Sequence, residues 1–219
     1  QDPDGKSRKV KPFAFVGADG VRSATRTRYL GGPDARYTGK VAWRALVAPD
    51  ALSDVLDLNR TSLLLNPHFH LVVYPLPHRN AVNLALFTQE KERDLSVLEK
   101  RAPQINARKD NRLTRILDSV GQGWTPWVLS SVETPTWHKG AIGLIGDAAH
   151  AMLPFQAQGA AMGIEDAAVL APLLAASPSA EHAFSRFAAL RQERVKRVQD
   201  VSASNGKIFH MGFPFSLAR

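Results

Sequence analysis

The sequence of 219 residues contains no cysteine and no continuous apolar run of the roughly 18 to 20 residues that a membrane helix needs. Nothing after Gln1 follows the basic-then-apolar pattern of a signal peptide, and no Cys and His spacing typical of a zinc site occurs. A chain without disulfide chemistry weakly favours a reducing compartment. We therefore expect a cytoplasmic protein with no membrane span and no metal.

Acidic residues are in the minority, because 20 Asp and Glu stand against 28 Lys and Arg, giving a formal net charge of +8. Clustered basic residues supply the phosphate contacts of nucleic-acid-binding proteins. Here the basic residues are spread along the chain, they are not interleaved with aromatic residues, and no nucleic-acid-binding motif occurs. We expect no nucleic-acid partner and attribute the positive charge to small anionic ligands.

The stretch that organises the chain lies near its middle. Residues 141–145 form a short apolar run that predicts a buried strand, and Gly146-Asp147 breaks it at a turn. After Pro154 a helix is expected to continue through Leu174. It opens with small residues, which are Ala157, Gly159, Ala160, Ala161 and Gly163. Missing side chains let a ligand approach the free N–H groups and the positive dipole end of the first turn.

This segment resembles the Gly-Asp motif of the single-component FAD-dependent aromatic hydroxylases, flavoprotein monooxygenases that include salicylate hydroxylase. The matching residues are Gly146-Asp147-Ala148-Ala149-His150, Pro154, Gln158-Gly159-Ala160 and Glu165-Asp166. The resemblance implies that Asp147 holds a ribityl hydroxyl of FAD and that Pro154 lines the reactive side of the flavin. It also implies that the backbone of residues 158–160 faces the pyrimidine edge, where a reduced flavin is negative. The alternative is an ordinary strand-turn-helix with a capping aspartate.

A second glycine-containing turn lies near the start of the chain. Residues 10–16 are expected to form a strand, and the sequence Gly-Ala-Asp-Gly at 17–20 then forces a tight turn before a short helix. This resembles the Asp-Gly motif of the same hydroxylases. The resemblance implies cofactor-binding roles for Asp19, Gly20 and Arg26, near the FAD pyrophosphate and in the use of NADH or NADPH. A plain strand-to-helix turn is the alternative, and two motifs in the family's order argue against it.

Residues 37–125 are expected to form a separate substrate domain built on an antiparallel sheet. Short β-rich runs, separated by turn residues, occupy 63–65, 69–75 and 81–87, with a helical turn at 49–58 before them and surface helices after Asp94. Short connections between consecutive strands imply antiparallel pairing. The resemblance implies that such a sheet carries the substrate pocket.

Two side chains on this predicted sheet suit proton transfer. His70 and Tyr74 lie four residues apart on one strand, so a period of two places them on one face. A hydroxylase benefits from a deprotonated phenolic substrate, and histidine is well suited to accept that proton near neutral pH. The arrangement resembles that of hydroxynicotinate and 3-hydroxybenzoate hydroxylases, which implies catalytic roles for both. A core histidine is the alternative, and His68, on the same predicted face, is left open as the base.

Residues 126–219 are expected to return to the FAD-binding domain, to which residues 1–36 also belong. The last helix is expected at 180–202, with an apolar stripe and a basic, solvated remainder. The stripe comprises Phe184, Phe187, Leu190, Val195, Val198 and Val201, and the remainder includes Arg186, Arg191, Glu193, Arg194, Lys196 and Arg197. A helix packed on its own domain is favoured over a membrane-surface or partner-binding helix.

The Gly-x-Gly-x-x-Gly fingerprint that opens these hydroxylases is absent. We therefore expect an α/β (α+β) C-terminal fragment, part of a Rossmann-like FAD-binding domain with an inserted antiparallel-sheet domain. The expected function is hydroxylation of a phenolic or N-heteroaromatic acid with FAD, NAD(P)H and O2, with a homodimer left open for the intact enzyme. The alternatives are a hydroxylase of a quinone precursor or polyketide, and a non-catalytic remnant or interaction module.

Overall fold

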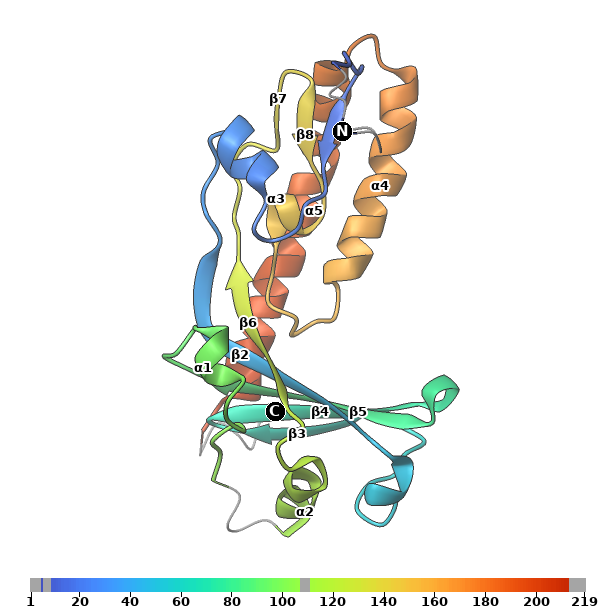
Figure 1. Ribbon diagram of the computed structural model, residues 1–219. Helices are drawn as coiled ribbons and strands as arrows, with labels where there is room; N and C mark the ends of the chain where they lie inside the picture. Colours follow the sequence, from blue (N-terminus) through green and yellow to red (C-terminus); the bar gives the residue numbers. More distant parts are fainter. Residues whose placement is uncertain (1–4, 6–8, 107–110, 213–219) are drawn as a thin grey trace. The chain divides into compact units, whose positions relative to one another are not determined.

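The computed structural model describes residue 5 and residues 9–106 and 111–212, which form two compact units (Figure 1). Unit 1 is drawn from Gln1–Arg36 and Ser130–Ser202, and unit 2 from Tyr37–Leu129 and Ala203–Arg219. Each unit combines helices with a sheet, which confirms the expected mixed fold class. The polar sequence of residues 1–9 predicts a loop, and of these residues only 5 and 9 are described. The assignment of functional domains to sequence ranges stays a prediction.

Unit 1 contains a small sheet in the order β1-β8-β7. Strand β1 (Phe15–Gly17) pairs in parallel with β8 (Ile142–Leu144), and β8 pairs antiparallel with β7 (His138–Lys139). Buried Leu144 of β8 packs in one apolar cluster with Met162, Phe184 and Phe187. Gly143 has no room for a side chain, because a Cβ there would overlap the ring of Phe184. The parallel pair thus delivers two loops, after residues 17 and 144, to the same edge of the sheet.

The helices of unit 1 follow these two loops and then close over the sheet. A short π-helix (Thr25–Tyr29) follows β1, and α3 (Asp147–His150) follows β8. Helices α4 (Gly159–Ala176) and α5 (Ala180–Phe209) come next, and their buried residues complete the apolar cluster. Helix α5 continues beyond the end of unit 1 at Ser202.

The predicted stripe on the last helix is partly wrong. Phe184, Phe187 and Val195 are buried as expected, but Leu190 is 60% exposed and Val201 is 40% exposed. A spacing of three and four residues from Phe184 leads through Phe187 to Arg191 and Val195, so the buried face includes an arginine. The charge of Arg191 predicts a solvated position, whereas its angular position on the helix is that of the apolar stripe.

Unit 2 contains a five-stranded sheet in the order β3-β4-β5-β2-β6, in which β3, β4, β5 and β2 pair antiparallel. The strands are β2 (Arg36–Val47), β3 (Ser62–Asn66), β4 (Phe69–Leu76), β5 (Ala81–Gln89) and β6 (Thr125–Ser131). One face is apolar and buried, because alternate residues such as Trp43, Leu71 and Leu84 point to it. Helix α2 (Asn111–Val120) contributes Ile116 to this core, and the short α1 (Leu95–Leu98) contributes Leu98.

Several predicted bounds differ from the structure. The strand predicted at 10–16 is only Phe15–Gly17, because Pro12 lacks the amide N–H that a strand would use. The helical turn predicted at 49–58 is a 3₁₀ turn over Pro49–Ala51 only, and another 3₁₀ turn covers Pro77–Arg79. The sequence also predicts a turn over residues 134–140, and this stretch contains the short strand β7 (His138–Lys139).

Helix α4 meets the simple criteria for a membrane span, with 18 residues and a mean hydropathy of 1.4. It is the single helix to do so within the described ranges. The apolar run in this helix is not continuous, because Glu165 and Asp166 interrupt it. Both carboxylates form ion pairs with Arg191 of α5. Its acidic groups are therefore neutralised inside unit 1, as expected for a helix packed within a folded domain.

Candidate functional site

The loop after β8 is a sharp turn that presents one carboxylate. Gly146 adopts φ 58° and ψ −143°, a conformation that residues with a side chain rarely take. Its carbonyl accepts the amide N–H of Ala149 at 2.9 Å and of His150 at 3.0 Å, which starts α3. Asp147 lies exposed on this turn, and no hydrogen bond or ion pair joins its side chain to the rest of the described chain. The turn thus offers a carboxylate that is available to a ligand.

The start of α4 is open in the way the sequence predicts. Pro154 accepts the amide N–H of Ala157 at 3.2 Å, and Ala157 takes a positive φ of 53° that redirects the chain into the helix. Gln158 occupies the N-cap without a side-chain hydrogen bond to the helix. A Cβ added at Gly159 would meet no atom within 4 Å, and Ala160 is exposed. The first-turn N–H groups and the positive dipole end are therefore accessible to an anionic group.

The carboxylate of Asp19 is used within its own turn. It accepts hydrogen bonds from Ser23 Oγ at 2.6 Å, from Thr25 N at 3.0 Å and from Thr25 Oγ1 at 3.1 Å. Burial alone would raise the pKa of Asp19, but these bonds hold the pKa below its ordinary value. Gly20 has a positive φ of 76°, which lets the chain turn here. Asp19 therefore stabilises the Asp-Gly turn through these three hydrogen bonds.

Arg26 connects the two predicted motifs. Its side chain is fully buried, and all three guanidinium nitrogens donate to backbone carbonyls. Nε donates to Pro33 O at 2.7 Å, Nη2 to Val21 O at 2.7 Å and Nη1 to Ala148 O at 2.8 Å. The last bond reaches α3 of the Gly-Asp motif. Arg26 therefore contributes to the site by fixing the backbone of the Asp-Gly turn and of α3.

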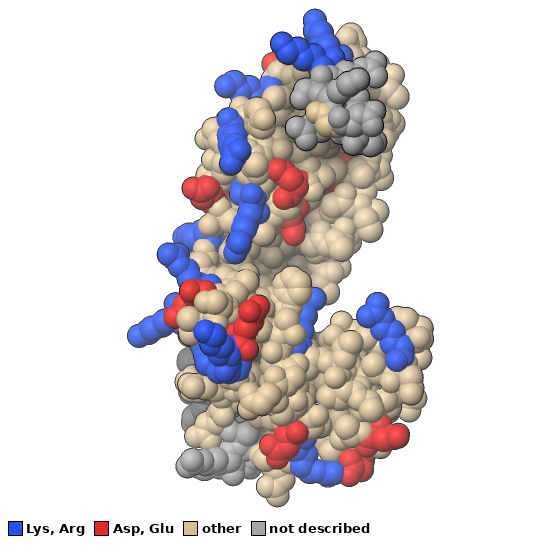
Figure 2. Space-filling view, in the orientation of Figure 1, with Lys and Arg blue, Asp and Glu red and all other residues tan. Residues whose placement is uncertain are grey.

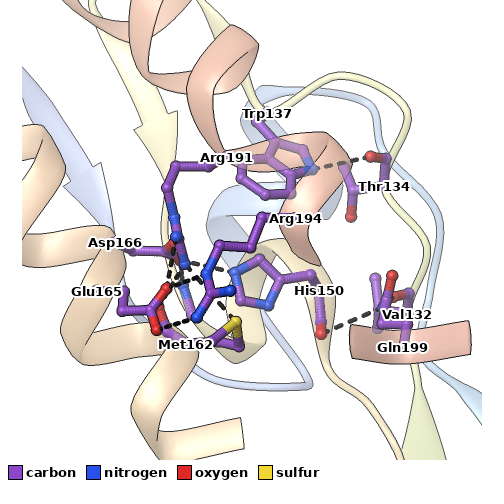
Figure 3. A network of polar contacts seen from close by, with 11 residues as sticks. Val132, Thr134, Trp137, His150, Met162, Glu165, Asp166, Arg191, Arg194 and Gln199 are labelled. Atoms are coloured by element: carbon purple, nitrogen blue, oxygen red, sulfur yellow. Dashed lines mark hydrogen bonds and ion pairs between the residues drawn. The ribbon is translucent and has the colours of Figure 1, made fainter. Parts of the chain in front are cut away.

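A buried polar network around Asp166 and Arg191 also holds the Gly-Asp turn (Figure 3). Asp166, which is fully buried on α4, accepts the Gly146 amide N–H at 2.8 Å and His150 Nε2 at 2.6 Å on one oxygen. Its other oxygen accepts Arg191 Nε at 2.8 Å. Glu165 binds Arg191 Nη1 at 2.7 Å and also forms a bidentate pair with Arg194 at 2.6 Å. Every buried charge in this group is thus paired.

The predicted catalytic residues belong to unit 2. His70 is 1% exposed on β4, and its Nδ1 lies 2.9 Å from Nε2 of His210. Its ring stacks on Phe87 with centroids 4.5 Å apart. Burial, followed by the charges of His210 and Lys40, lowers the pKa of His70 to about 3. His70 is therefore a neutral imidazole at physiological pH.

Tyr74 shares the face of His70, as the period of two predicts, since the intervening Leu71 and Val73 lie in the core. Tyr74 is 37% exposed and therefore accessible. His68 lies outside β4, in the hairpin turn before it, where its amide donates to Asn66 Oδ1 at 3.0 Å. The prediction that His68 shares the strand face is wrong, because the turn interrupts the alternation.

The structure thus gathers all nine predicted flavin residues in unit 1 and both predicted catalytic residues in unit 2. Sequence reasoning missed Arg191 and His210 as functional candidates. An arginine at a buried position of an apolar stripe signals a buried acidic partner, which could have pointed to Asp166. Nothing local to the sequence pairs His210 with His70. No group of three or more residues suited to a metal ion occurs among the described side chains.

Basic side chains are scattered over the face seen in Figure 2, with acidic ones among them, and they form no continuous patch on that face. This distribution differs from the basic surface that phosphate contacts along a nucleic acid require.

Comparison with known proteins identifies the family. The profile described as an FAD binding domain matches residues 1–204. A 3-amino-4-hydroxybenzoate 2-monooxygenase of Streptomyces platensis is 34% identical over 95% of this chain and 53% of its own length. A 3-hydroxybenzoate 6-hydroxylase of Aquipseudomonas alcaligenes is 32% identical over 88% of this chain and 50% of its own length. The chain belongs to the FAD binding domain family.

A solved structure of a salicylate hydroxylase substrate complex is also similar, with a TM-score of 0.72 and 27% identity. That likeness covers 97% of this chain and 58% of the other. The chain spans about half the length of the curated relatives it matches. The match to an FAD binding domain fits the geometry of unit 1, because an unpaired carboxylate and an open helix start are the donors and acceptors that a flavin needs.

Proposed function

We propose that the protein is an FAD-dependent monooxygenase that hydroxylates an aromatic acid with NAD(P)H and O2. The observation that carries the proposal is the exposed carboxylate of Asp147, which has no partner among the described residues and lies on a turn held by hydrogen bonds at Gly146 and Ala148. Asp147 would accept a hydroxyl of the FAD ribityl chain. The N–H groups at the start of α4, near Gly159, would face the negative edge of the flavin. FAD, when bound, supplies the redox and oxygen chemistry.

The substrate that we propose is a phenolic or N-heteroaromatic acid. The sheet face of His70 and Tyr74 also carries Arg44 and Lys40 of β2. Arg44 pairs with Ala85 of β5, and Ala85 pairs in turn with Val72, which lies between His70 and Tyr74 on β4. Lys40 lies four residues before Arg44 and so points to the same face. Cations on this face suit a substrate carboxylate. Two relatives are named for their action on hydroxybenzoates, and one solved relative is a salicylate hydroxylase. These names support the substrate class.

We assign the proton-accepting role on this face to His70. A neutral imidazole has a lone pair available for a phenolic proton, but a pKa of about 3 makes His70 a weak base, so the role requires that bound substrate raise this pKa toward the operating pH. Tyr74, which is accessible, would orient the substrate by its hydroxyl. The same proposal includes NADH or NADPH as the co-substrate, a cytoplasmic location and a homodimer of the intact enzyme.

The test is product analysis with the full-length, FAD-loaded protein, a panel of hydroxylated aromatic acids and isotopically labelled O2. A monooxygenase incorporates one labelled oxygen atom into the product for each NAD(P)H consumed. Labelled hydroxylated product from an aromatic acid is the expected result. Oxidation of NAD(P)H that yields no labelled product with any of these acids would contradict the proposed substrate class. Absence of FAD from the purified protein would contradict the proposal that it is a flavoenzyme.

A further inference from the structure

Asp166 is the most heavily engaged buried carboxylate of unit 1. It has no solvent exposure, and it accepts three hydrogen bonds from three separate parts of the chain. The donors are the backbone of Gly146, the imidazole of His150 and the guanidinium of Arg191. Two of these donors bracket α3, the four-residue helix that begins with Asp147. One side chain on α4 therefore contacts both ends of the segment that presents the flavin-binding carboxylate.

The bond to Gly146 acts at a turn whose conformation favours glycine. Because Gly146 has φ 58° and ψ −143°, the turn needs an interaction that favours this conformation over the many that glycine can take. The N–H of Gly146 points to Asp166 Oδ2 at 2.8 Å, and His150 Nε2 donates to the same oxygen at 2.6 Å. These two bonds fix where α3 begins and how it is rotated, and hence where Asp147 points.

The charge on Asp166 makes these bonds strong. Burial alone would raise its pKa, but the bond and charge of His150, the Gly146 amide and Arg191 hold it below the ordinary value, so the carboxylate is ionised. Arg191 is itself buried, and Glu165 fixes its far end. The arrangement keeps a negative charge behind the turn without exposing it to the ligand side.

We propose that Asp166 is a positioning residue of the flavin site, which holds the Gly146 turn so that Asp147 is set for FAD before the cofactor binds. The inference rests on the proposed function. In it, Asp166 acts on the flavin through the turn that it holds and not by direct contact. Arg26 contributes at a second point, through its bond to Ala148 O. FAD affinity should therefore depend on a buried residue of α4 more strongly than loss of stability alone explains.

The experiment compares FAD affinity among variants of the full-length protein, by quenching of flavin fluorescence, at a temperature where each variant is folded. Asp166→Asn keeps the size of the side chain but loses the charge and at least one accepted bond. We expect its Kd for FAD to rise roughly tenfold or more. The absorption band of the bound flavin should also shift, because a loosened turn changes the hydrogen bonds to the ring and its solvent access.

Two matched variants separate positioning from stability. Phe187→Leu loosens the apolar cluster of unit 1 but removes none of the three hydrogen bonds to Asp166, and it should leave the Kd for FAD close to that of the wild type at a similar loss of Tm. Glu165→Gln weakens the outer ion pairs but keeps the Gly146 bond, and it should also retain FAD. Should Asp166→Asn not fold, His150→Leu removes one donor of the same oxygen and should raise the Kd roughly threefold or more.

An unchanged Kd in Asp166→Asn, or in His150→Leu where that variant stands in, would overturn the inference. An equal rise in Phe187→Leu at matched Tm would overturn it too, because stability alone would then explain the loss. Failure of the wild-type protein to bind FAD would instead overturn the proposed function, so the two failures are distinguishable.

Discussion

The guanidinium Nη1 of Arg26 donates to the carbonyl oxygen of Ala148 at 2.8 Å, and this bond joins two segments that lie far apart in the sequence. One segment is the Asp-Gly turn after β1, and the other is α3 of the Gly-Asp turn. Because β1 and β8 are parallel neighbours, both turns leave the same edge of the sheet. A single buried arginine can therefore hold the two together.

Replacing Arg26 by Lys should destabilise the protein by about 2 to 4 kcal/mol, because an ammonium group cannot reach three carbonyls at once. Urea denaturation measures the effect. Arg28→Lys is the matched control, since Arg28 is exposed on the same short helix and should change the free energy of unfolding by less than about 0.5 kcal/mol. Equal effects of the two variants would contradict the bracing role of Arg26.

Gly159→Ala should separate stability from cofactor binding. Without FAD, a methyl group at this position meets no protein atom within 4 Å, so the free energy of unfolding should stay the same or rise slightly. With FAD, the methyl group would stand where the cofactor approaches the helix start, and the Kd for FAD should rise.

Gly212→Ala is the control for Gly159→Ala, because its added Cβ also meets no atom within 4 Å and it lies outside the predicted flavin residues. Thermal unfolding without FAD and flavin titration of both variants provide the two readouts. Unchanged FAD affinity in Gly159→Ala would show that the cofactor does not approach this helix start.

His70 should make unit 2 sensitive to acid. Its pKa is about 3 in the folded protein against an ordinary value of 6.5, so below pH 6.5 the unfolded chain binds a proton that the folded chain does not. Stability should therefore fall as the pH drops from about 6.5 toward 3, by about 2 kcal/mol at pH 5. Burial, His210 and Lys40 together produce this lowered pKa, so their contributions are already included in the effect.

The measurement for this acid sensitivity is the free energy of unfolding against pH for the wild type and His70→Leu. Between pH 6.5 and 4, the free energy of unfolding should depend less steeply on pH in the variant, because the contribution of His70 is lost. His78→Leu, at an exposed position in the 3₁₀ turn after β4, should keep the wild-type slope. Parallel curves for the wild type and His70→Leu would mean that folding does not lower the pKa of His70.

Substitution of His70 by Gln in the FAD-loaded, full-length protein should lower turnover of a phenolic acid by roughly 10² to 10⁴, the usual contribution of a general base. The Kd for FAD should not change, since His70 lies outside the predicted flavin contacts. His68→Gln, in the neighbouring hairpin turn, should retain turnover. Loss of turnover in His68→Gln with retention in His70→Gln would reverse the assignment.

The sequence predicts the backbone of the Gly-Asp turn and the start of α4 well because their determinants are local, and the flavin contacts there stay a prediction. The apolar run before Gly146, the break at Asp147 and the small residues before Ala161 each specify backbone geometry within a few residues. The antiparallel sheet of unit 2 is equally local, since short turns fix the pairing of β3, β4 and β5.

The parts that the sequence does not predict depend on contacts between distant residues. The burial of Arg191 follows from its partner Asp166 on another helix, and the burial of His70 follows from its contact with His210 near the end of α5. Helical spacing places Arg191 among apolar neighbours, but only the packed structure supplies the carboxylates that neutralise it. A charged residue on a buried face is thus interpretable only together with its partner.

The most direct measurement is titration of FAD into the full-length protein and its Asp147→Ala variant, followed by flavin fluorescence. Because Asp147 is exposed and has no side-chain partner in the described chain, the variant should unfold at the wild-type temperature. We predict that the wild type binds FAD and that Asp147→Ala raises the Kd roughly tenfold or more, through loss of a charged acceptor. Equal FAD affinity in the two proteins would contradict the account, because the braced turn would then present its carboxylate to something other than the flavin.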